Sequence, residues 1–109
     1  MSPYQVDRTT WQERSFIDQM ANIGSEVGRS LEAKQVGKPD RSQQAMLRAL
    51  DLFDATTEQL VRDHSPRTKE VLRAKEQFLI ALTDSEDHGM GADTNSYFLQ
   101  FGQAARCRS

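Results

Sequence analysis

Residues 16–40 read FIDQMANIGSEVGRSLEAKQVGKPD. The large apolar side chains of this segment recur every three or four residues, at Phe16, Met20, Ile23, Val27 and Leu31. That spacing places them on one stripe of an α-helix that faces a core. Val36 and Gly37 follow, and glycine at such a point is typical of a helix end. We therefore predict a long first helix that begins at Thr10, with Glu13 completing its capping box.

Three further segments show the same helical spacing, and none shows the alternation of a strand. A second helix is predicted from Asp40, as its N-cap, to about His64. A third is predicted from Pro66, with Ser65 as its N-cap, because serine caps helices and proline fits the first helical position. A fourth begins at about Thr94. The apolar positions expected in the core are Met46, Ala49, Leu50, Phe53, Leu60, Val61, Val71, Leu72, Phe78, Leu79, Leu82, Tyr97, Phe98, Phe101, Ala104 and Ala105.

The first two connections between the predicted helices are short, so the helices they join should run antiparallel, and the longer third loop allows the same arrangement. The predicted fold class is all-α: an antiparallel up-down-up-down four-helix bundle with two longer and two shorter helices. We expect a flexible N-terminal arm over residues 1–9 and a single four-helix domain over residues 10–109. A chain of 109 residues fits one domain and can bury a core without disulfides or metals.

The first two predicted helices span roughly 24–27 residues each and the last two about 15–18, so the first hairpin should overhang by about 10 Å. This tip carries Leu31, Val36 and Leu47. Either the acidic loop over residues 84–93 or a second copy of the chain could cover it, and both interpretations stay open here. Contact with the loop is favoured by three basic residues at the tip, Lys34, Lys38 and Arg41.

The composition, 37% hydrophobic and 28% charged, is ordinary for a globular protein. A net charge of −2 argues against nucleic acid as the main partner, because phosphate binding needs a clustered excess of cations. Cys107 stands alone in the sequence, which excludes a disulfide framework. Residues 1–10 lack the features of a leader peptide, and no apolar run is long enough to span a membrane. We therefore expect a cytoplasmic protein with no membrane partner.

The sequence shows no residue pattern typical of catalysis. His64 and His88 have no nucleophile or acid at a recognisable spacing, and glycine-rich phosphate loops and HExxH motifs are missing. The segment from Asp84 matches several positions of a calcium loop, but Asn95 stands where the bidentate glutamate belongs. We predict no catalytic residue, no metal site and no cofactor, and we lean towards a protein that is not an enzyme.

Gly24 and Gly28 interrupt the first predicted helix, although each glycine weakens a helix by about 1 kcal/mol relative to alanine. The structural interpretation is the close approach of a neighbouring helix. One functional alternative is a ligand-binding or enzymatic groove between the first and fourth helices, floored by these glycines and Gly102. A second alternative is RNA binding at the corner of the second and third helices, where the basic residues are Arg62, Arg67, Lys69, Arg73 and Lys75.

Three segments carry a resemblance to a known family: NIGSEVGR at residues 22–29, RALDLFDAT at 48–56 and YFLQFGQAAR at 97–106. Through them the chain resembles a family of short, uncharacterised bacterial proteins over most of its length from residue 20 onward. The resemblance implies a small helical bundle. It carries no catalytic residue across, because the shared motifs consist mainly of apolar spacing.

The predicted function is a small, non-enzymatic helical interaction module that self-associates, as a homodimer, or docks on a protein partner. Glu26 and Arg29 lie away from the apolar stripe of the first helix, beside the small Ser25, which suits hydrogen-bonded recognition of a partner. The aromatic residues near the N-terminus are candidate anchors, since interface energy is concentrated in a few large side chains. The predicted partner-contact residues are Tyr4, Trp11, Glu26, Arg29, Leu31 and Val36.

Overall fold

A computed structural model describes residues 5–84 and 89–107 of the chain, and the regular secondary structure of these residues is entirely helical. One short helix comes first and four longer ones follow it. Their bounds are α1 Arg8–Gln12, α2 Phe16–Gln35, α3 Pro39–Arg62, α4 Thr68–Thr83 and α5 Met90–Cys107. The all-α prediction is confirmed over this part of the chain, with five helices where four were expected.

The additional helix arises because the expected first helix is divided at residues 13–15. The Asp7 side chain caps α1 by accepting hydrogen bonds from two backbone N–H groups of its first turn. Ser15 then caps α2 by accepting from the N–H of Asp18 at 3.1 Å. The predicted start at Thr10 was wrong: Asp7 and Ser15, on either side of it, are the residues that cap helices. The predicted start at Pro66 was wrong as well, because α4 begins at Thr68 with Arg67 as its N-cap.

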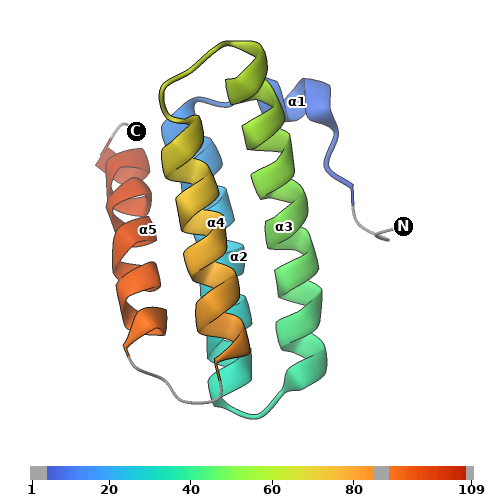
Figure 1. The fold of residues 1–109 in the computed structure, drawn as a ribbon, viewed down its shortest axis with the longest axis vertical. Coiled ribbons are helices and arrows are strands. Elements are labelled where there is room, and N and C mark those ends of the chain that lie inside the picture. Colours follow the sequence, from blue (N-terminus) through green and yellow to red (C-terminus); the bar gives the residue numbers. More distant parts are fainter. Residues whose placement is uncertain (1–4, 85–88, 108–109) are drawn as a thin grey trace.

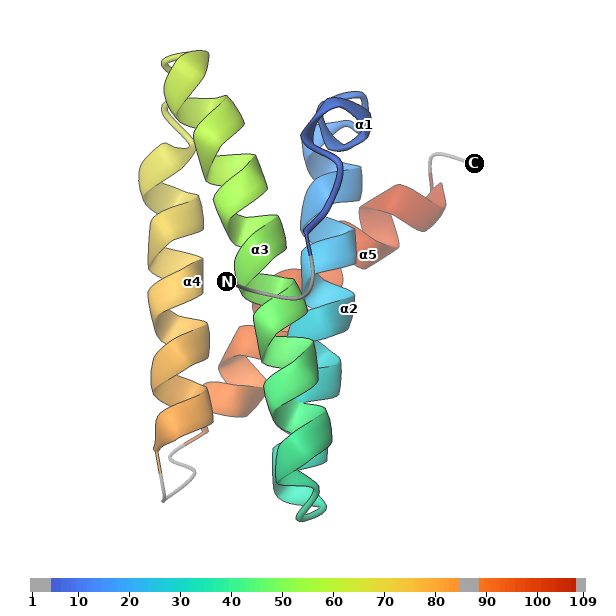
Figure 2. The same ribbon diagram turned by 90° about the vertical axis from the view of Figure 1, so that its right-hand side faces the viewer.

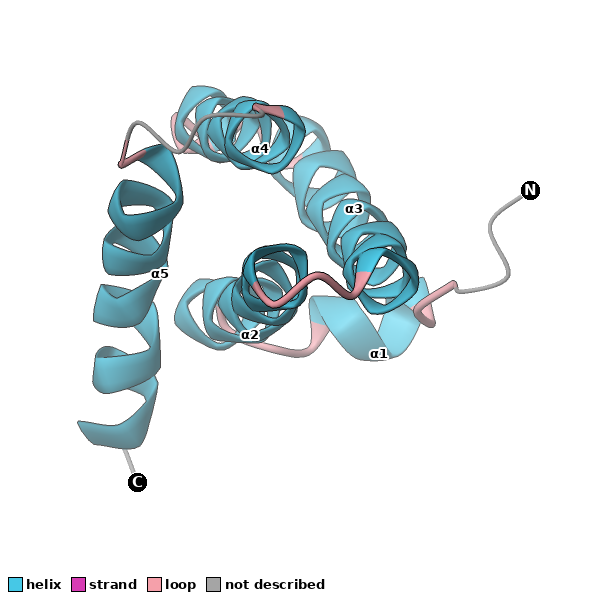
Figure 3. Ribbon diagram, turned by 90° about the horizontal axis from the view of Figure 1, so that it is seen from below, coloured by secondary structure: helices cyan, strands magenta, loops and turns pink. Residues whose placement is uncertain are grey.

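Helices α2, α3 and α4 lie side by side, and the chain reverses direction after α2 and again after α3 (Figure 1). α5 takes an oblique course behind them (Figure 2). Seen from below, α2, α3 and α4 appear nearly end-on whereas α5 lies across the view (Figure 3). α2 packs against α3, α4 and α5. Its contacts with α3 and α5 are the most extensive between any of the described helices.

Three phenylalanine rings connect α3, α4 and α5 in the core. The ring of Phe53 lies 6.3 Å from that of Phe78 and 6.0 Å from that of Phe98, measured between centroids. Aliphatic side chains of α2 complete this cluster, and they are fully buried: Met20, Ile23 and Val27. The periodic stripe predicted for the first helix is thus the buried face of α2.

Two residues expected in the core, Val61 and Leu72, are exposed, so their assignment was wrong. Leu72 follows the fully buried Val71, and one residue corresponds to about 100° of helical rotation, which turns it outward. Val61 follows Leu60 in the last turn of α3, and Leu60 takes the position packed against the core. Periodicity located both stripes but overestimated their width.

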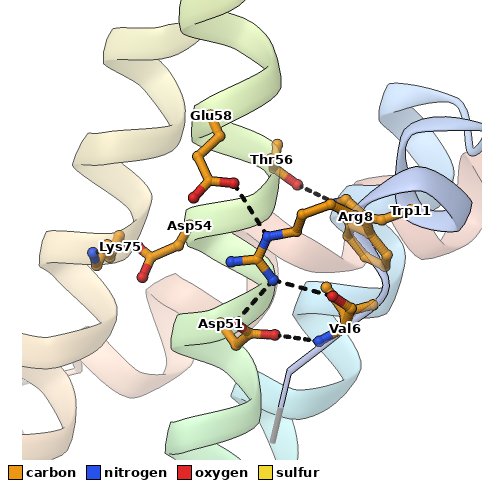
Figure 4. Close-up of polar contacts among 8 residues, drawn as sticks. All are labelled: Val6, Arg8, Trp11, Asp51, Asp54, Thr56, Glu58 and Lys75. Carbon is orange, nitrogen blue, oxygen red and sulfur yellow. Dashed lines mark hydrogen bonds and ion pairs between the residues drawn. The ribbon is translucent and has the colours of Figure 1, made fainter. Parts of the chain in front are cut away.

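A buried polar network joins α1, α2 and α3. The indole N–H of Trp11 donates to Thr56 Oγ1 at 2.9 Å (Figure 4), and this hydroxyl donates to Gln19 Oε1 at 3.0 Å. The Gln19 amide group donates in turn to the backbone oxygen of Trp11 at 3.0 Å and to Gln59 Oε1 at 2.9 Å. Trp11 was expected at a partner contact. It is instead buried in the core, so its ring is not presented to a partner in this structure.

The segment that precedes α1 is attached to α3 (Figure 4). The N–H of Val6 donates to Asp51 Oδ2 at 2.7 Å, and Arg8 pairs with Asp51 at 3.0 Å and with Glu58 at 3.1 Å. Burial alone would lower the pKa of Arg8, but the hydrogen bonds and charges of the two carboxylates outweigh it and raise the pKa. Val6 and Arg8, both in the expected flexible arm, are therefore held against α3, and residues 1–4 lie outside the described residues.

α2 and α5 approach each other closely at Gly24. A Cβ atom at this position would lie 2.8 Å from the Cβ of Phe98, closer than two such atoms can normally approach. A Cβ atom at Gly28 would meet only Asn95 Oδ1 at 3.7 Å, an ordinary contact distance. The interpretation of the two glycines as a close helix approach is thus confirmed at Gly24 and not needed at Gly28.

Replacing Gly24 with alanine should destabilise the protein, because the new methyl group and Phe98 cannot both keep their positions. We expect the free energy of unfolding to fall by about 1–3 kcal/mol, the usual range for overpacking. The matched control is Gly28→Ala, which should raise it by up to about 1 kcal/mol through helix propensity. Chemical denaturation measures both. Effects of the same sign and size would contradict the close approach.

Two neighbouring threonines of α3 offer a test of the buried polar network. Thr56→Val removes the hydroxyl that serves Trp11 and Gln19, and we expect a loss of about 1–3 kcal/mol in stability because buried partners are left unpaired. Thr57 Oγ1 is also buried but has no hydrogen-bond partner among the residues described. Thr57→Val should therefore be neutral or stabilising. If thermal denaturation finds the two variants equally destabilised, the network does not form as described.

Candidate functional site

A groove of about 620 Å³ lies between the end of α2 and the start of α3, at the tip of their hairpin. This hairpin forms the lower end of the molecule in Figure 2. We call the hollow the tip groove, and it is lined by Arg29, Glu32, Ala33, Val36, Lys38, Arg41, Gln44, Ala45 and Arg48. Both helices contribute, so its shape depends on how α2 and α3 are held together.

Two buried serines hold the helices together behind the tip groove. Ser30 Oγ donates to the backbone oxygen of Ser42 at 2.8 Å, and Ser42 Oγ donates to the backbone oxygen of Ser30 at 2.8 Å. The reciprocal bonds satisfy both hydroxyl groups without water. Because serine is small, the two backbones can come close, and the small Ala33 and Ala45 beside them are buried as well. The register of α2 against α3 is therefore specified by side chains at this point.

The turn between the two helices is built by hydrogen bonds of the backbone. The N–H of Lys38 donates to the carbonyl of Ala33 at 2.8 Å, and that of Gly37 donates to the carbonyl of Lys34 at 3.2 Å. This is the Schellman pattern, which requires a left-handed residue, and Gly37 supplies it at φ 74°. The predicted helix end is thus confirmed. The predicted N-cap Asp40 was wrong: α3 starts two residues earlier, with Lys38 at the cap and Pro39 as its first residue.

Glu26 connects the two walls of the tip groove. Its carboxylate accepts from Arg29 Nη1 at 2.6 Å, on the same helix, and from Arg48 Nε at 2.9 Å, on α3. The Glu26 side chain is only 14% exposed, whereas the two guanidinium groups reach solvent. Hydrogen bonds between ionised groups are stronger than neutral ones. One carboxylate therefore positions two cations at the rim of the groove.

The remaining charges of the tip groove are mostly positive. Lys38 and Arg41 are exposed and form no ion pair within residues 5–84 and 89–107. Four cationic side chains line the groove against the single carboxylate of Glu32, although the whole chain carries a net charge of −2. Val36 adds an apolar side chain that is 61% exposed. The arrangement can attract carboxylate groups and offers one apolar contact beside them.

Lys34 takes a different direction from the other basic residues of the tip. Its ammonium group donates to the backbone oxygen of Ala81 at 2.9 Å and to that of Asp84 at 2.6 Å. The lysine thus satisfies carbonyl groups at the end of α4, where the helix dipole favours a cation. The expected contact between the tip and the acidic loop is made here through backbone oxygens, while residues 85–88 lie outside the described range.

A second hollow, of about 330 Å³, borders α2 on the side of α1. Glu26 and Arg29 line it, and Arg29 also lines the tip groove. Asn22 and Ser25 belong to this hollow as well. The polar surface predicted on the first helix therefore borders two adjoining hollows.

The alternative site between the first and fourth helices corresponds to a groove of about 360 Å³ between α2 and α5. Gly24 and Gly102 line it, together with polar residues that include Asn95 and Arg106. Gly28 is not among its lining residues. Phe98 occupies the space above Gly24, so the floor of this groove is a packed contact.

The basic corner considered for RNA is partly engaged by other residues. The guanidinium of Arg67 lies 4.4 Å from the ring centroid of Phe16, and Lys75 pairs with Asp54 at 3.0 Å. Nearby, the hydroxyl of Tyr97 donates to Glu70 at 2.7 Å. Burial above all, and then the hydrogen bond and charge of Glu70, raises the pKa of Tyr97. Arg67 and Lys75, two of the five basic residues at this corner, thus already have partners within the protein.

Within the described ranges no cluster of histidine, cysteine, aspartate and glutamate could hold a metal ion. None of the helices in that part of the chain is long and apolar enough to cross a membrane. No protein-family model matches the chain, and neither a curated protein nor a solved structure proved similar to it. The resemblance to short bacterial proteins therefore stays a prediction.

The six predicted partner-contact residues have three different outcomes. Glu26, Arg29 and Val36 lie at the tip groove or its edge. Leu31, like Trp11, is buried in the core and does not reach the surface. Tyr4 lies outside the described residues.

Sequence reasoning missed Arg48 as a member of the site. A signal was present, because Arg41, Gln44, Ala45 and Arg48 follow the helical spacing of one face. What the sequence could not show is the pairing of that face with Glu26.

Replacing Glu26 with glutamine should destabilise the hairpin, because two arginines lose their shared carboxylate. We expect a loss of about 1 kcal/mol in the free energy of unfolding, reduced in high salt. Glu32→Gln is the control, since Glu32 lines the same groove but forms no ion pair in the described structure; its effect should stay within about 0.5 kcal/mol. Urea denaturation at low and high salt measures both. An equal loss in the two variants would contradict the bridging role.

Proposed function

We propose that this chain is a non-enzymatic helical interaction module that docks an acidic segment of a protein partner in the tip groove. The observation that carries the proposal is the set of cations around the groove, two of them held by Glu26 and two without an ion pair in the described residues, beside the exposed Val36. Complementary charge steers association and orients a partner. The single apolar residue would supply the anchor.

A protein segment fits this groove better than nucleic acid. The nine lining residues include no aromatic ring on which a base could stack, and Glu32 would repel a phosphate chain. The net charge of −2 also opposes an extended phosphate contact. Carboxylates next to an aliphatic side chain, by contrast, would match both the arginines and Val36.

The proposal treats the helices as an antiparallel bundle of α2 to α5 and places the protein in the cytoplasm. The first point is supported by the chain reversals after α2 and α3 (Figure 1). The second rests on the sequence argument alone. In this antiparallel arrangement, the rigid hairpin of α2 and α3 presents a charged groove at one end of the molecule.

The test uses a variant that reverses two groove charges without weakening the fold. Lys38→Asp places a preferred residue at the N-cap of α3, and Arg41→Glu places an acid in its first turn, so both should be neutral or stabilising. The control is Lys69→Glu with Arg73→Glu, which changes the net charge equally on the exposed surface of α4. The probe is a labelled peptide of glutamates around one leucine.

We expect the peptide to shift NMR signals of Ala33, Val36 and Ala45 in the wild-type chain, with affinity at least about tenfold weaker in the groove variant and unchanged within about twofold in the control. A glutamine version of the peptide should not bind. Absence of shifts, equal weakening in the control variant, or tighter binding of a single-stranded RNA of the same charge would each reject the proposal.

A further inference from the structure

An apolar face of α4 has no partner in the described structure. Leu72 is 45% exposed and Ile80 is 43% exposed, and Leu79 is half-buried between them along the helix. Together with Lys75, Glu76 and Thr83 they line a shallow hollow of about 480 Å³ that α4 forms alone. We call these six residues the α4 face. In Figure 3, α4 lies at the edge of the molecule with open space on the side away from α2.

The inner and outer sides of α4 are both apolar, but only one is covered. Val71, Ala74, Phe78 and Ala81 face the core and are buried. On the opposite side Leu79 is packed against the edge of the core, whereas Leu72 and Ile80 leave apolar surface in water. Exposed apolar residues that form a contiguous patch, rather than scattered ones, mark interaction sites. The exposed patch on α4 is therefore a candidate interaction site.

The order of residues along the α4 face is symmetric, with inverted charge. From Leu72 the face continues through Lys75 and Glu76 to Leu79. In an antiparallel pair whose two-fold axis passes between Lys75 and Glu76, Leu72 of one helix lies opposite Leu79 of the other. In the same pair, Lys75 of each helix lies opposite Glu76 of the other. A two-fold interface uses the same patch on both subunits and must be complementary to itself, and this face meets that condition.

The two charged residues are available for such a contact. Glu76 is exposed and forms no ion pair in the parts of the chain that are described. Lys75 donates to Asp54 of α3 at 3.0 Å (Figure 4), and an ammonium group has two further N–H donors. A parallel arrangement would bring lysine to lysine and glutamate to glutamate, which is repulsive. Only the antiparallel arrangement joins opposite charges.

We propose that a second copy of this chain docks on the α4 face, with the two α4 helices antiparallel and Lys75 of each copy paired with Glu76 of the other. The tip groove takes no part, so the dimer carries two free grooves. α4 is about 24 Å long, and a single pair of such helices lies at the lower end of interface sizes. The dimer is therefore weak and dissociates on dilution.

The experiment is sedimentation velocity over a concentration series that reaches roughly millimolar chain, where weak dimers become populated. Wild-type protein should shift towards the dimer as concentration rises. Lys75→Glu and Glu76→Lys should each weaken self-association at least tenfold, because each places like charges opposite one another. An equimolar mixture of the two variants should restore association to within about threefold of wild type, as a heterodimer in which every pair is again opposite.

Leucine substitutions provide the matched control for the apolar part. Leu72→Gln should weaken the dimer at least tenfold, whereas Leu99→Gln, which removes a leucine that is 54% exposed on α5, should leave it unchanged. Circular dichroism confirms that each variant is folded. A wild-type chain that stays monomeric over the series overturns the proposal, as does a mixture that fails to associate or a Leu99→Gln effect as large as that of Leu72→Gln.

Discussion

The exchange of hydrogen bonds between Ser30 and Ser42 is the constraint on which the rest of this structure depends. Each serine hydroxyl donates to the backbone oxygen of the other serine, and Ser30 has no exposed surface. Sliding α2 along α3 would therefore leave buried hydroxyl groups unpaired. Apolar side chains alone would tolerate such a shift more easily. The serines thus convert a pair of amphipathic helices into a hairpin with one register, and that register places Glu26 beside Arg48.

Much of the fold follows from the spacing of apolar residues, because a helix that buries one face needs an apolar residue at every third or fourth position. The stripe of α2 and the helix end at Gly37 were predicted for this reason. The break before Phe16 was not, since Thr10 with Glu13 satisfies the same local rule as the true caps Asp7 and Ser15. Capping preferences alone are compatible with several helix N-termini, and tertiary contacts determine which of them forms.

The candidate site was only partly predictable. Charge and position suggested Arg29 and Val36, which do line the tip groove. Trp11 was misjudged because a large aromatic near a terminus reads as an anchor, and the partner of its N–H lies 45 residues away at Thr56. Arg48 was missed for a related reason, as its role depends on a carboxylate from another helix. Contacts between distant residues are what a single sequence does not display.

The fold leaves two surfaces of different character, a cationic groove at the tip and an apolar face on α4. The proposal for the tip groove assumes that α2 and α3 are rigidly joined. The most direct measurement of that joint is an isotope-edited NOE experiment on the free protein. The two serine hydroxyl oxygens lie 3.3 Å apart, so the β protons of Ser30 and Ser42 should give a mutual NOE. An absent NOE between them, with Ser42 protons in contact with a different turn of α2, would contradict the register and the groove that depends on it.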